Sequence, residues 1–232
     1  KVTSLNSRMR YPQIFINHSG KSIFIKPIDL NGGKNSFAIN MNEISDDEKL
    51  KKSYDLLNSG KFIYQEKLKQ HRDINRIYSQ SINTVRVHSF YNQEKDEVEL
   101  ISALMRFGKD GVEVDNGSAG GLYVAVDLNN WRLIGNGKNY YSNGGTIFKS
   151  HPNSNTIFNG FELPFKEEVY PLIDKAHRLF PNKMIGWDLA FTPDGITIVE
   201  GNYSPHLVMA QVSSGGFRQH EGFNRVFGEY IK

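Results

Sequence analysis

The segment GWDLAFTPDGITIVEGN, residues 186–202, constrains the fold more than any other part of the chain, because it reads as two apolar strands around a tight turn. The turn TPDG at 192–195 predicts a type I turn followed by a left-handed glycine, the usual three-residue hairpin loop with a bulge. In that register the first residue of the turn faces Ile196, and Asp188 faces Glu200. We therefore expect an antiparallel hairpin with a fixed pairing.

Side chains alternate across a strand, so this hairpin has two faces. The expected core face carries Trp187, Leu189, Phe191, Thr197 and Val199. The expected outer face carries Asp188, Ala190, Ile198, Glu200 and Asn202. Like charges directly opposite one another destabilise a sheet, so something positive should lie between Asp188 and Glu200. Two carboxylates and an amide oxygen are hard ligands that suit Mg²⁺; a solvated face with incidental acids is the alternative.

Composition excludes several classes of protein. A length of 232 residues allows one large domain or two small ones with real cores. The net charge of +3 is too mild to indicate a nucleic-acid partner. Cysteine is absent, which excludes disulfides and thiolate metal sites. We find neither an apolar run of about 18 residues nor an opening signal peptide, and therefore expect no membrane span and a cytoplasmic location.

Apolar patterning predicts many strands and few helices. Strands are expected at 22–28, 37–41, 61–68, 84–90, 98–107, 122–127 and 131–137, with the last two forming a hairpin. Helices are expected at 46–58, after a capping box, and at 165–180, where apolar residues recur at helical spacing up to Leu179 and Phe180. Runs of strands with so few helices indicate an α+β fold.

Basic side chains interrupt three of these strands. Lys26, in IFIKP, precedes the glycine-rich loop LNGGKNS, and a lysine charge with glycine N–H groups can hold phosphate oxygens. The alternative for Lys26 is an edge or snorkelling residue. Neither the Walker spacing nor GxGxxG is present. Arg86 and Arg106 lie inside apolar strands, where a buried arginine needs an anion. Either alone fits a structural ion pair, whereas both together with Lys26 and the acid pair describe a polyphosphate site.

The order of these parts resembles the ATP-grasp superfamily: a strand lysine with a glycine loop, the QE-x-L segment in YQEKL (64–68), two strand arginines, DNGSAGG (115–121) and finally D-x11-E-x-N. The phrases SINTVRV, DNGSAGGLYVAVD, GWDLAFTPDG and VEGN are most similar to the sugar-transfer-associated ATP-grasp family. The similarity covers roughly residues 23–218. It implies two α+β subdomains with mostly antiparallel sheets that enclose ATP.

The resemblance also implies a domain division. Residues 1–66 would form the central ATP-grasp subdomain, with the lysine strand, the glycine loop and the hinge. Residues 67–232 would form the C-terminal subdomain, with the arginine strands and the metal-binding hairpin. Members of this superfamily usually have a further N-terminal domain before the lysine strand, and we expect that domain to be missing here.

Roles for individual residues follow from the same resemblance. Lys26 would hold the α- and β-phosphates, Gly32 and Gly33 would cover them, and Gln65, Glu66, Lys67 and Leu68 would bind adenine. Asp188, Glu200 and Asn202 would ligate Mg²⁺, with Glu200 shared by two ions. Arg86 and Arg106 would be the catalytic residues that face the transferred phosphoryl group or the acyl phosphate. Asn116, Gly120 and Gly121 would shape the acceptor pocket.

The implied activity is that of an ATP- and Mg²⁺-dependent carboxylate–amine ligase that acts through an acyl phosphate. Its partners would be a small-molecule carboxylate and an amine. By analogy with the family, the reaction would belong to polysaccharide or cell-surface glycan biosynthesis. Two alternatives stay open. One is an ATP-grasp kinase that phosphorylates a hydroxyl substrate, and the other is a non-catalytic nucleotide- or carbohydrate-binding module. The sequence does not predict the oligomeric state.

Overall fold

The computed structural model describes residues 2–3, 22–28, 37–40, 55–56, 58–117 and 120–230. The chain divides into two compact units, Lys1–Leu68 and Lys69–Lys232, each with its own sheet. The sequence expectation had set the division after residue 66. Across these described ranges, no helix is both long enough and apolar enough to cross a membrane.

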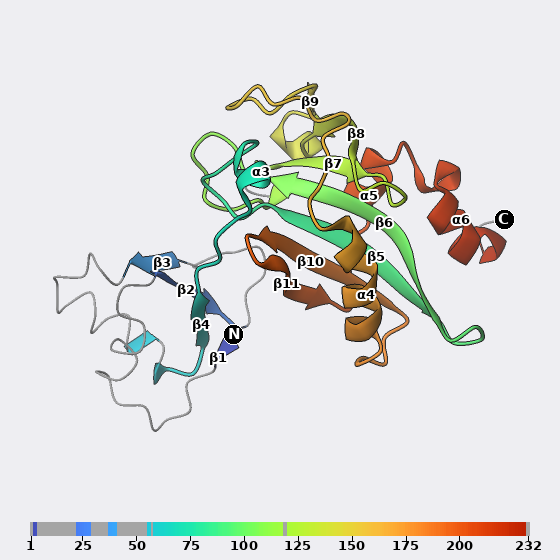
Figure 1. Cartoon of the computed structure of the whole chain (residues 1–232), viewed down its shortest axis with the longest axis horizontal. Coiled ribbons are helices and arrows are strands. Elements are labelled where there is room, and N and C mark those ends of the chain that lie inside the picture. Colours follow the sequence, from blue (N-terminus) through green and yellow to red (C-terminus); the bar gives the residue numbers. More distant parts are fainter. Residues whose placement is uncertain are drawn as a thin grey trace. The chain divides into compact units, whose positions relative to one another are not determined.

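The first unit contains a four-stranded antiparallel sheet in the order β1-β4-β2-β3 (Figure 1). Its strands are β1 (Val2–Thr3), β2 (Ser22–Pro27), β3 (Phe37–Asn40) and β4 (Phe62–Glu66). The alternation of β2 buries Ile23 and Ile25, which pack with Tyr64 of β4 and Ile39 of β3. The strands expected in this region are therefore confirmed. The helix expected at 46–58 falls largely outside the described residues.

The second unit is built on a seven-stranded antiparallel sheet in the order β11-β10-β5-β6-β7-β8-β9 (Figure 1). The strands are β5 (Thr84–Asn92), β6 (Glu97–Phe107), β7 (Leu122–Val126), β8 (Leu133–Lys138), β9 (Ile147–Phe148), β10 (Met184–Thr192) and β11 (Gly195–Asn202). The α-helices are α3 (Arg72–Asn75), α4 (Lys166–His177), α5 (Val208–Ser213) and α6 (Glu221–Phe227). Short 3-10 helices are η2 (Tyr141–Asn143), η3 (Phe217–Gln219) and η4 (Gly228–Tyr230). The α+β class is confirmed.

The two faces of the large sheet differ in chemistry. One face holds the main core, to which β5 contributes Val85 and Val87 and α4 contributes Val169 and Ile173. The opposite face has a smaller apolar cluster of Leu104, Tyr123, Met209, Ala210 and Phe217. Helix α5 packs on β6 and β7 through that cluster. The polar side chains of β10 and β5 lie on the remaining part of the same face.

Helix α4 is shorter than the sequence predicted. It begins at Lys166 and ends at His177, which is fully buried and accepts or donates a hydrogen bond at 2.7 Å to the Ser89 hydroxyl. Leu179 and Phe180 follow the helix end and are largely exposed. Their assignment to the helical core stripe was therefore wrong, because the helix ends before they could complete that stripe.

The β10–β11 hairpin differs from its predicted register in one instructive way. Thr192 pairs with Gly195, so the loop has two residues, and the Thr192 hydroxyl closes it by donating to the Gly195 carbonyl at 2.9 Å. The extra residue enters later, at a bulge between the Leu189–Ile198 and Asp188–Glu200 pairs. As a result Ile198 packs against the main core. The assignments of Ile198 to the outer face and of Thr197 to the core face were wrong, because each residue of β11 between the loop and the bulge pairs one position away from the expected register.

Candidate functional site

Three rows of side chains cross the polar face of the large sheet. Strand pairing places Glu200, Asp188, Arg86 and Leu104 in one row, since each lies opposite the next. The next row contains Asn202, Gly186, His88 and Ser102. On the other side of the first row, Arg106 lies opposite Tyr123, which lies opposite Lys138. The predicted Asp188–Glu200 pairing is confirmed.

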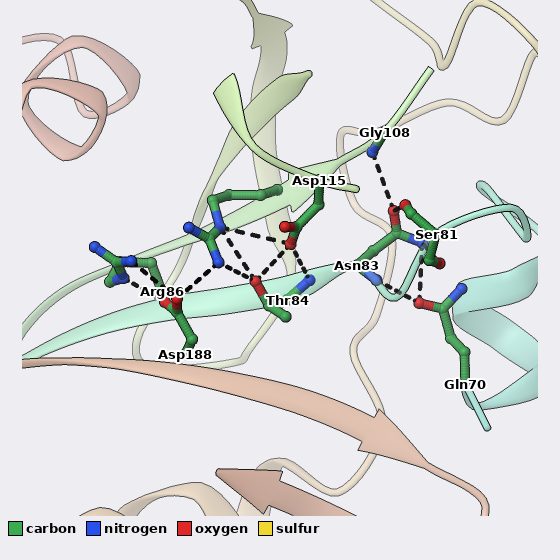
Figure 2. A network of polar contacts seen from close by, with 9 residues as sticks. Gln70, Ser81, Asn83, Thr84, Arg86, Gly108, Asp115 and Asp188 are labelled. Carbon is green, nitrogen blue, oxygen red and sulfur yellow. Dashed lines mark hydrogen bonds and ion pairs between the residues drawn. The ribbon is translucent and has the colours of Figure 1, made fainter. Parts of the chain in front are cut away.

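Asp188 lies at the centre of an ion-pair network (Figure 2). Both its carboxylate oxygens accept from Arg86: Nε donates to Oδ1, and Nη2 donates to Oδ2 at 2.9 Å. Arg106 Nη2 contacts the same Oδ2 at 2.9 Å. All three side chains are at most 9% exposed. Both guanidinium groups reach Asp188 from strands on the side away from Glu200, so the cation expected between Asp188 and Glu200 stays a prediction.

Asp115 and Thr84 complete the network on the far side of Arg106. Arg106 Nε donates to the Thr84 hydroxyl at 3.1 Å and lies 3.5 Å from Asp115 Oδ2. The same Oδ2 accepts from the Thr84 backbone N–H at 2.8 Å and from the Thr84 hydroxyl. Two buried arginines thus face two buried aspartates. The two buried positive charges are therefore matched by two buried negative charges, which avoids leaving a buried charge unpaired.

Burial and the two arginines shift the pKa values of the acids and of the histidine on this face. Burial raises the pKa of Asp188, but the charges of Arg106 and Arg86 and their hydrogen bonds outweigh it, so that pKa lies below its usual value. Burial also raises the pKa of Asp115, and here Arg106 and Thr84 do not fully compensate. Burial and the charge of Arg86 lower the pKa of His88 to about 3, so this histidine is neutral. Its Nδ1 lies 2.9 Å from the Ser102 hydroxyl, and its buried Nε2 has no hydrogen-bond partner among the residues that the structure describes.

A second network fixes the start of β5. Asn83 is fully buried; its amide nitrogen donates to Gln70 Oε1 at 2.9 Å, and its amide oxygen accepts from Ser81 and from the Gly108 N–H (Figure 2). Gly108 directly follows β6. Asn83 therefore ties the end of β6 to the beginning of β5, and Thr84 and Arg106 are held at the same end of the sheet.

Glu200 and Asn202 are the hard-oxygen groups of this face that remain available. Among the described residues, Glu200 makes no hydrogen bond or ion pair, and it is exposed. The Asn202 side-chain N–H donates to the Gly186 carbonyl at 3.3 Å, and the amide oxygen accepts no hydrogen bond from the described residues. Asp188 has carboxylate lone pairs beyond those that the arginines use. The described ranges contain no group of three His, Cys, Asp or Glu side chains that could hold a metal, so an ion here would need the Asn202 oxygen and water.

The described residues of the DNGSAGG segment, 115–117 and 120–121, bring predicted acceptor residues next to the network. Gly121 donates its N–H to the Asn116 carbonyl at 3.2 Å, and Gly120 has a positive φ of 89°. A Cβ on Gly121 would lie within 2.9 Å of three backbone oxygens, so only glycine fits there. Asn116 and Gly120 are partly buried. Their role in binding an acceptor stays a prediction.

The predicted nucleotide residues of the first unit lie on two adjacent strands. Lys26 lies opposite Ile63 and is half-buried, on the face of β2 opposite to Ile23 and Ile25. Gln65 and Glu66 end β4, and Leu68 follows. The Lys67 N–H donates to the Ser22 carbonyl at 2.8 Å and is therefore not free for a purine. Gly32 and Gly33 lie outside the described residues.

Sequence reasoning missed Thr84, Asp115 and His88. A signal existed for the first two: Thr84 precedes Arg86 at the spacing of a strand face, and Asp115 opens the DNGSAGG motif whose next residue was singled out. No local pattern marks His88, since its burial depends on the pairing of three strands.

Comparison with known proteins finds one matching family and several solved structures with a similar fold. The profile of the family described as "Sugar-transfer associated ATP-grasp" matches residues 6–222. No curated protein matches the sequence. Among solved structures, D-alanyl-alanine synthetase A from Vibrio cholerae O1 superposes with a TM-score of 0.53 at 12% identity, over 98% of this chain and 57% of that one. N5-carboxyaminoimidazole synthetase from Staphylococcus aureus, complexed with ADP, gives 0.51 at 9% identity, over 88% and 40%.

A third structure, the ATP-grasp ligase PsnB complexed with precursor peptide PsnA2 and AMPPNP, gives a TM-score of 0.50 at 14% identity, over 92% of this chain and 47% of that one. The chain thus spans about half the length of the structures it matches. At these identities the likeness establishes the fold, which is that of the ATP-grasp ligases.

Proposed function

The chain belongs to the sugar-transfer-associated ATP-grasp family, and from that premise we propose that it is an ATP- and Mg²⁺-dependent carboxylate–amine ligase. An oxygen of the substrate carboxylate attacks the γ-phosphorus of ATP, and the bond to the β,γ-bridging oxygen breaks to release ADP. The resulting acyl phosphate is attacked at its carbonyl carbon by an amine, which loses a proton as phosphate departs. The products are an amide, ADP and phosphate.

One observation carries the proposal: the two buried arginines beside Asp188 retain unused donors. Each guanidinium has five N–H groups, and the hydrogen bonds to described residues use only Nε and Nη2. Nη1 of each guanidinium takes part in none of these hydrogen bonds and is left for a ligand. Fixed donors of this kind suit the charge that develops on a transferring phosphoryl group.

The acid hairpin supports a metal-bound nucleotide. Glu200 and Asn202 would hold Mg²⁺, and Asp188 would share its remaining lone pairs with the ion. Bound there, Mg²⁺ would neutralise phosphate charge during transfer. The carboxylate of Asp188 is already paired with two arginines, so Glu200, which makes no ion pair with a described residue, would be the main protein ligand.

For the nucleotide itself, the proposal rests on the first unit. Lys26 would hold the α- and β-phosphates as a point charge. Gln65, Glu66 and Leu68 would line the purine, which Lys67 would contact through its side chain or carbonyl because its N–H is engaged. The description of the family as sugar-transfer-associated supports a substrate from polysaccharide or cell-surface glycan biosynthesis.

The experiment is ADP release by the full chain with ATP, Mg²⁺ and pools of acids and amines, with product analysis by mass spectrometry. An amide supports the ligase. A phosphoester would instead make the protein a kinase, and nucleotide binding without ADP release would make it a binding module. Arg86→Lys keeps the charge but removes the planar fork, and should lower ADP release by about 10- to 100-fold. Arg132→Lys, on the surface, is the matched control.

A further inference from the structure

A pocket of about 510 Å³ opens next to the arginine network, on the same sheet face. Its walls come from β7, β8, the segment around η2, and α5. The lining residues that matter here are Tyr123, Lys138, Tyr140, Tyr141, Val208 and Val212. Tyr141 is 93% exposed, and Val208 and Val212 are about half-exposed, so apolar and aromatic surface faces an open volume.

Strand pairing places the pocket beside Arg106. Tyr123, on the floor of the pocket, lies directly opposite Arg106 on β6 and directly opposite Lys138 on β8. The ring of Tyr140 lies 5.9 Å from that of Tyr123. Side chains directly opposite one another in an antiparallel sheet are neighbours on one face. Arg106, Tyr123 and Lys138 therefore form a continuous row from the network into the pocket.

The glycine-rich turn joins the two sites physically. Gly117 backs the Tyr140 ring so closely that a Cβ there would lie 2.5 Å from Tyr140 Cε2. The Gly117 carbonyl also accepts from the Asn143 side chain of η2 at 2.7 Å. Two residues earlier in the same turn, Asp115 holds Arg106 and Thr84. The turn thus positions the pocket wall and the arginine network together.

The charge of the pocket selects its occupant. Among the described residues that line the pocket, Lys138 is the cation and none is acidic. Lys138 Nζ donates to the Val212 carbonyl at 2.5 Å, which fixes its position over α5. An amine would meet like charge here, whereas an acid would be attracted. Tyrosine rings offer flat, amphipathic faces on which a ring-shaped ligand can stack.

We propose that this pocket binds the carboxylic acid substrate, a small molecule with a ring-shaped body, whose ring lies on the tyrosines and whose carboxylate points to Lys138 and Arg106. The inference rests on the proposed ligase function and deepens it, since it assigns the pocket to the acid and not to the amine. A sugar acid and an aryl acid share this chemistry. Either would place its carboxylate at the arginine network, where phosphoryl transfer is proposed.

The test measures binding to the full chain without nucleotide, by calorimetry or by ligand-observed NMR. The probes are glucuronate and phenylacetate, each beside its uncharged counterpart, glucose or phenylacetamide, with phenethylamine as the cation. At least one acid should bind about tenfold more tightly than its uncharged counterpart. Whichever acid binds identifies the source as a sugar or an aryl compound. Phenethylamine should not bind.

Two variants locate the binding. Lys138→Gln and Tyr141→Ala should each weaken the acid about fivefold or more, while Lys95→Gln and Tyr230→Ala, both exposed and outside the pocket, should not. Tyr141 is so exposed that its removal should leave thermal unfolding unchanged. The inference is overturned if neither acid binds, if the amine binds equally well, or if both pocket variants bind as wild type does.

The two proposals fail separately. ADP release from ATP with an acid and an amine, in a protein that binds neither probe and whose activity survives Lys138→Gln and Tyr141→Ala, would refute the pocket assignment and leave the ligase intact. Binding of an acid probe in the pocket by a protein that binds no ATP would refute the ligase. It would also remove the substrate role of the pocket, though the measured ligand chemistry would stand.

Discussion

The side chain of Arg86 forms two hydrogen bonds with the carboxylate of Asp188, the residue directly opposite it on the neighbouring strand. Arg106 binds the same carboxylate from the next strand along. Asp188 is therefore the counter-ion of two buried cations before any ligand arrives. This separates its contribution from that of Glu200, its exposed partner in the same row.

Asp188→Asn should destabilise the second unit severely. The amide leaves two buried guanidinium groups without their shared charge partner, and breaking a buried pair in this way costs about 3–5 kcal/mol. The free energy of unfolding in urea is the measurement. Glu162→Gln, which removes an exposed ion pair with Arg132, should cost less than about 1 kcal/mol. Equal effects of the two changes would contradict the counter-ion role.

Glu200→Gln should leave stability almost unchanged and should instead weaken Mg²⁺-dependent binding of ATP. The side chain is exposed and makes no hydrogen bond or ion pair with described residues, so unfolding should change by less than about 0.5 kcal/mol. Binding of ATP measured by calorimetry should lose its dependence on Mg²⁺. Glu167→Gln, exposed at the start of α4, is the control. Unaltered Mg²⁺-dependent binding in Glu200→Gln would remove this residue from the metal site.

The turn at 115–121 should be intolerant at one glycine and more tolerant at its neighbour. Gly121→Ala forces a Cβ against the carbonyls of Phe107, Asn116 and Asp115, which are backbone and cannot rotate away. We expect about 2–3 kcal/mol of destabilisation. Gly120→Ala meets open space and pays only for its positive φ, about 1 kcal/mol. Thermal unfolding of both variants decides the order, and a reversed order would refute this account of the turn.

His88 should make stability fall with acid. Its pKa is about 3 in the folded chain and near 6.5 when unfolded, so its contribution is present above pH 6.5 and is lost as the pH falls towards 3. Between pH 7 and pH 5 the loss from this residue is about 2 kcal/mol. Arg86, Arg106 and Asp188 are its charged neighbours. His151, His177 and His220, whose pKa values are also lowered, act in the same direction.

His88→Asn isolates this contribution, since the amide keeps a polar partner for Ser102. Urea unfolding at several pH values should give a shallower decline between pH 7 and pH 5 than in wild type. The remaining slope belongs to the other groups with shifted pKa values, namely His151, His177, His220 and the buried aspartates. A decline identical to that of wild type would mean that His88 is not buried in its neutral form.

Local patterns were sufficient to predict most of the sheet. The strands around Ile23, Arg86, Arg106 and Trp187 are rich in apolar residues and lie where expected, as does the Asp188–Glu200 pair. What failed depends on contacts distant in sequence. The hairpin bulge depends on core packing of Ile198, and the end of α4 is set by the burial of His177 against Ser89.

The candidate site divides in the same way. Arg86, Arg106 and Asp188 were identifiable because a charge inside an apolar strand is costly without a partner. These three residues pair with one another because β10, β5 and β6 are neighbours in the sheet. That strand order cannot be read from the sequence of any single strand. Asp115 was hidden for the same reason: it lies beyond the end of β6 and reaches back to Thr84 at the start of β5.

The bulge at Val199 also separates the tip of the hairpin from its base. The spacing of Asp188 and Glu200 is set by the bulge, whereas Pro193 and Asp194 form an exposed two-residue loop several pairs away. Exposed loop tips accept foreign sequence more readily than paired strands. The hairpin tip is therefore a suitable place to attach a fluorescent label or an affinity tag, because an insertion there leaves the acids at the other end in position.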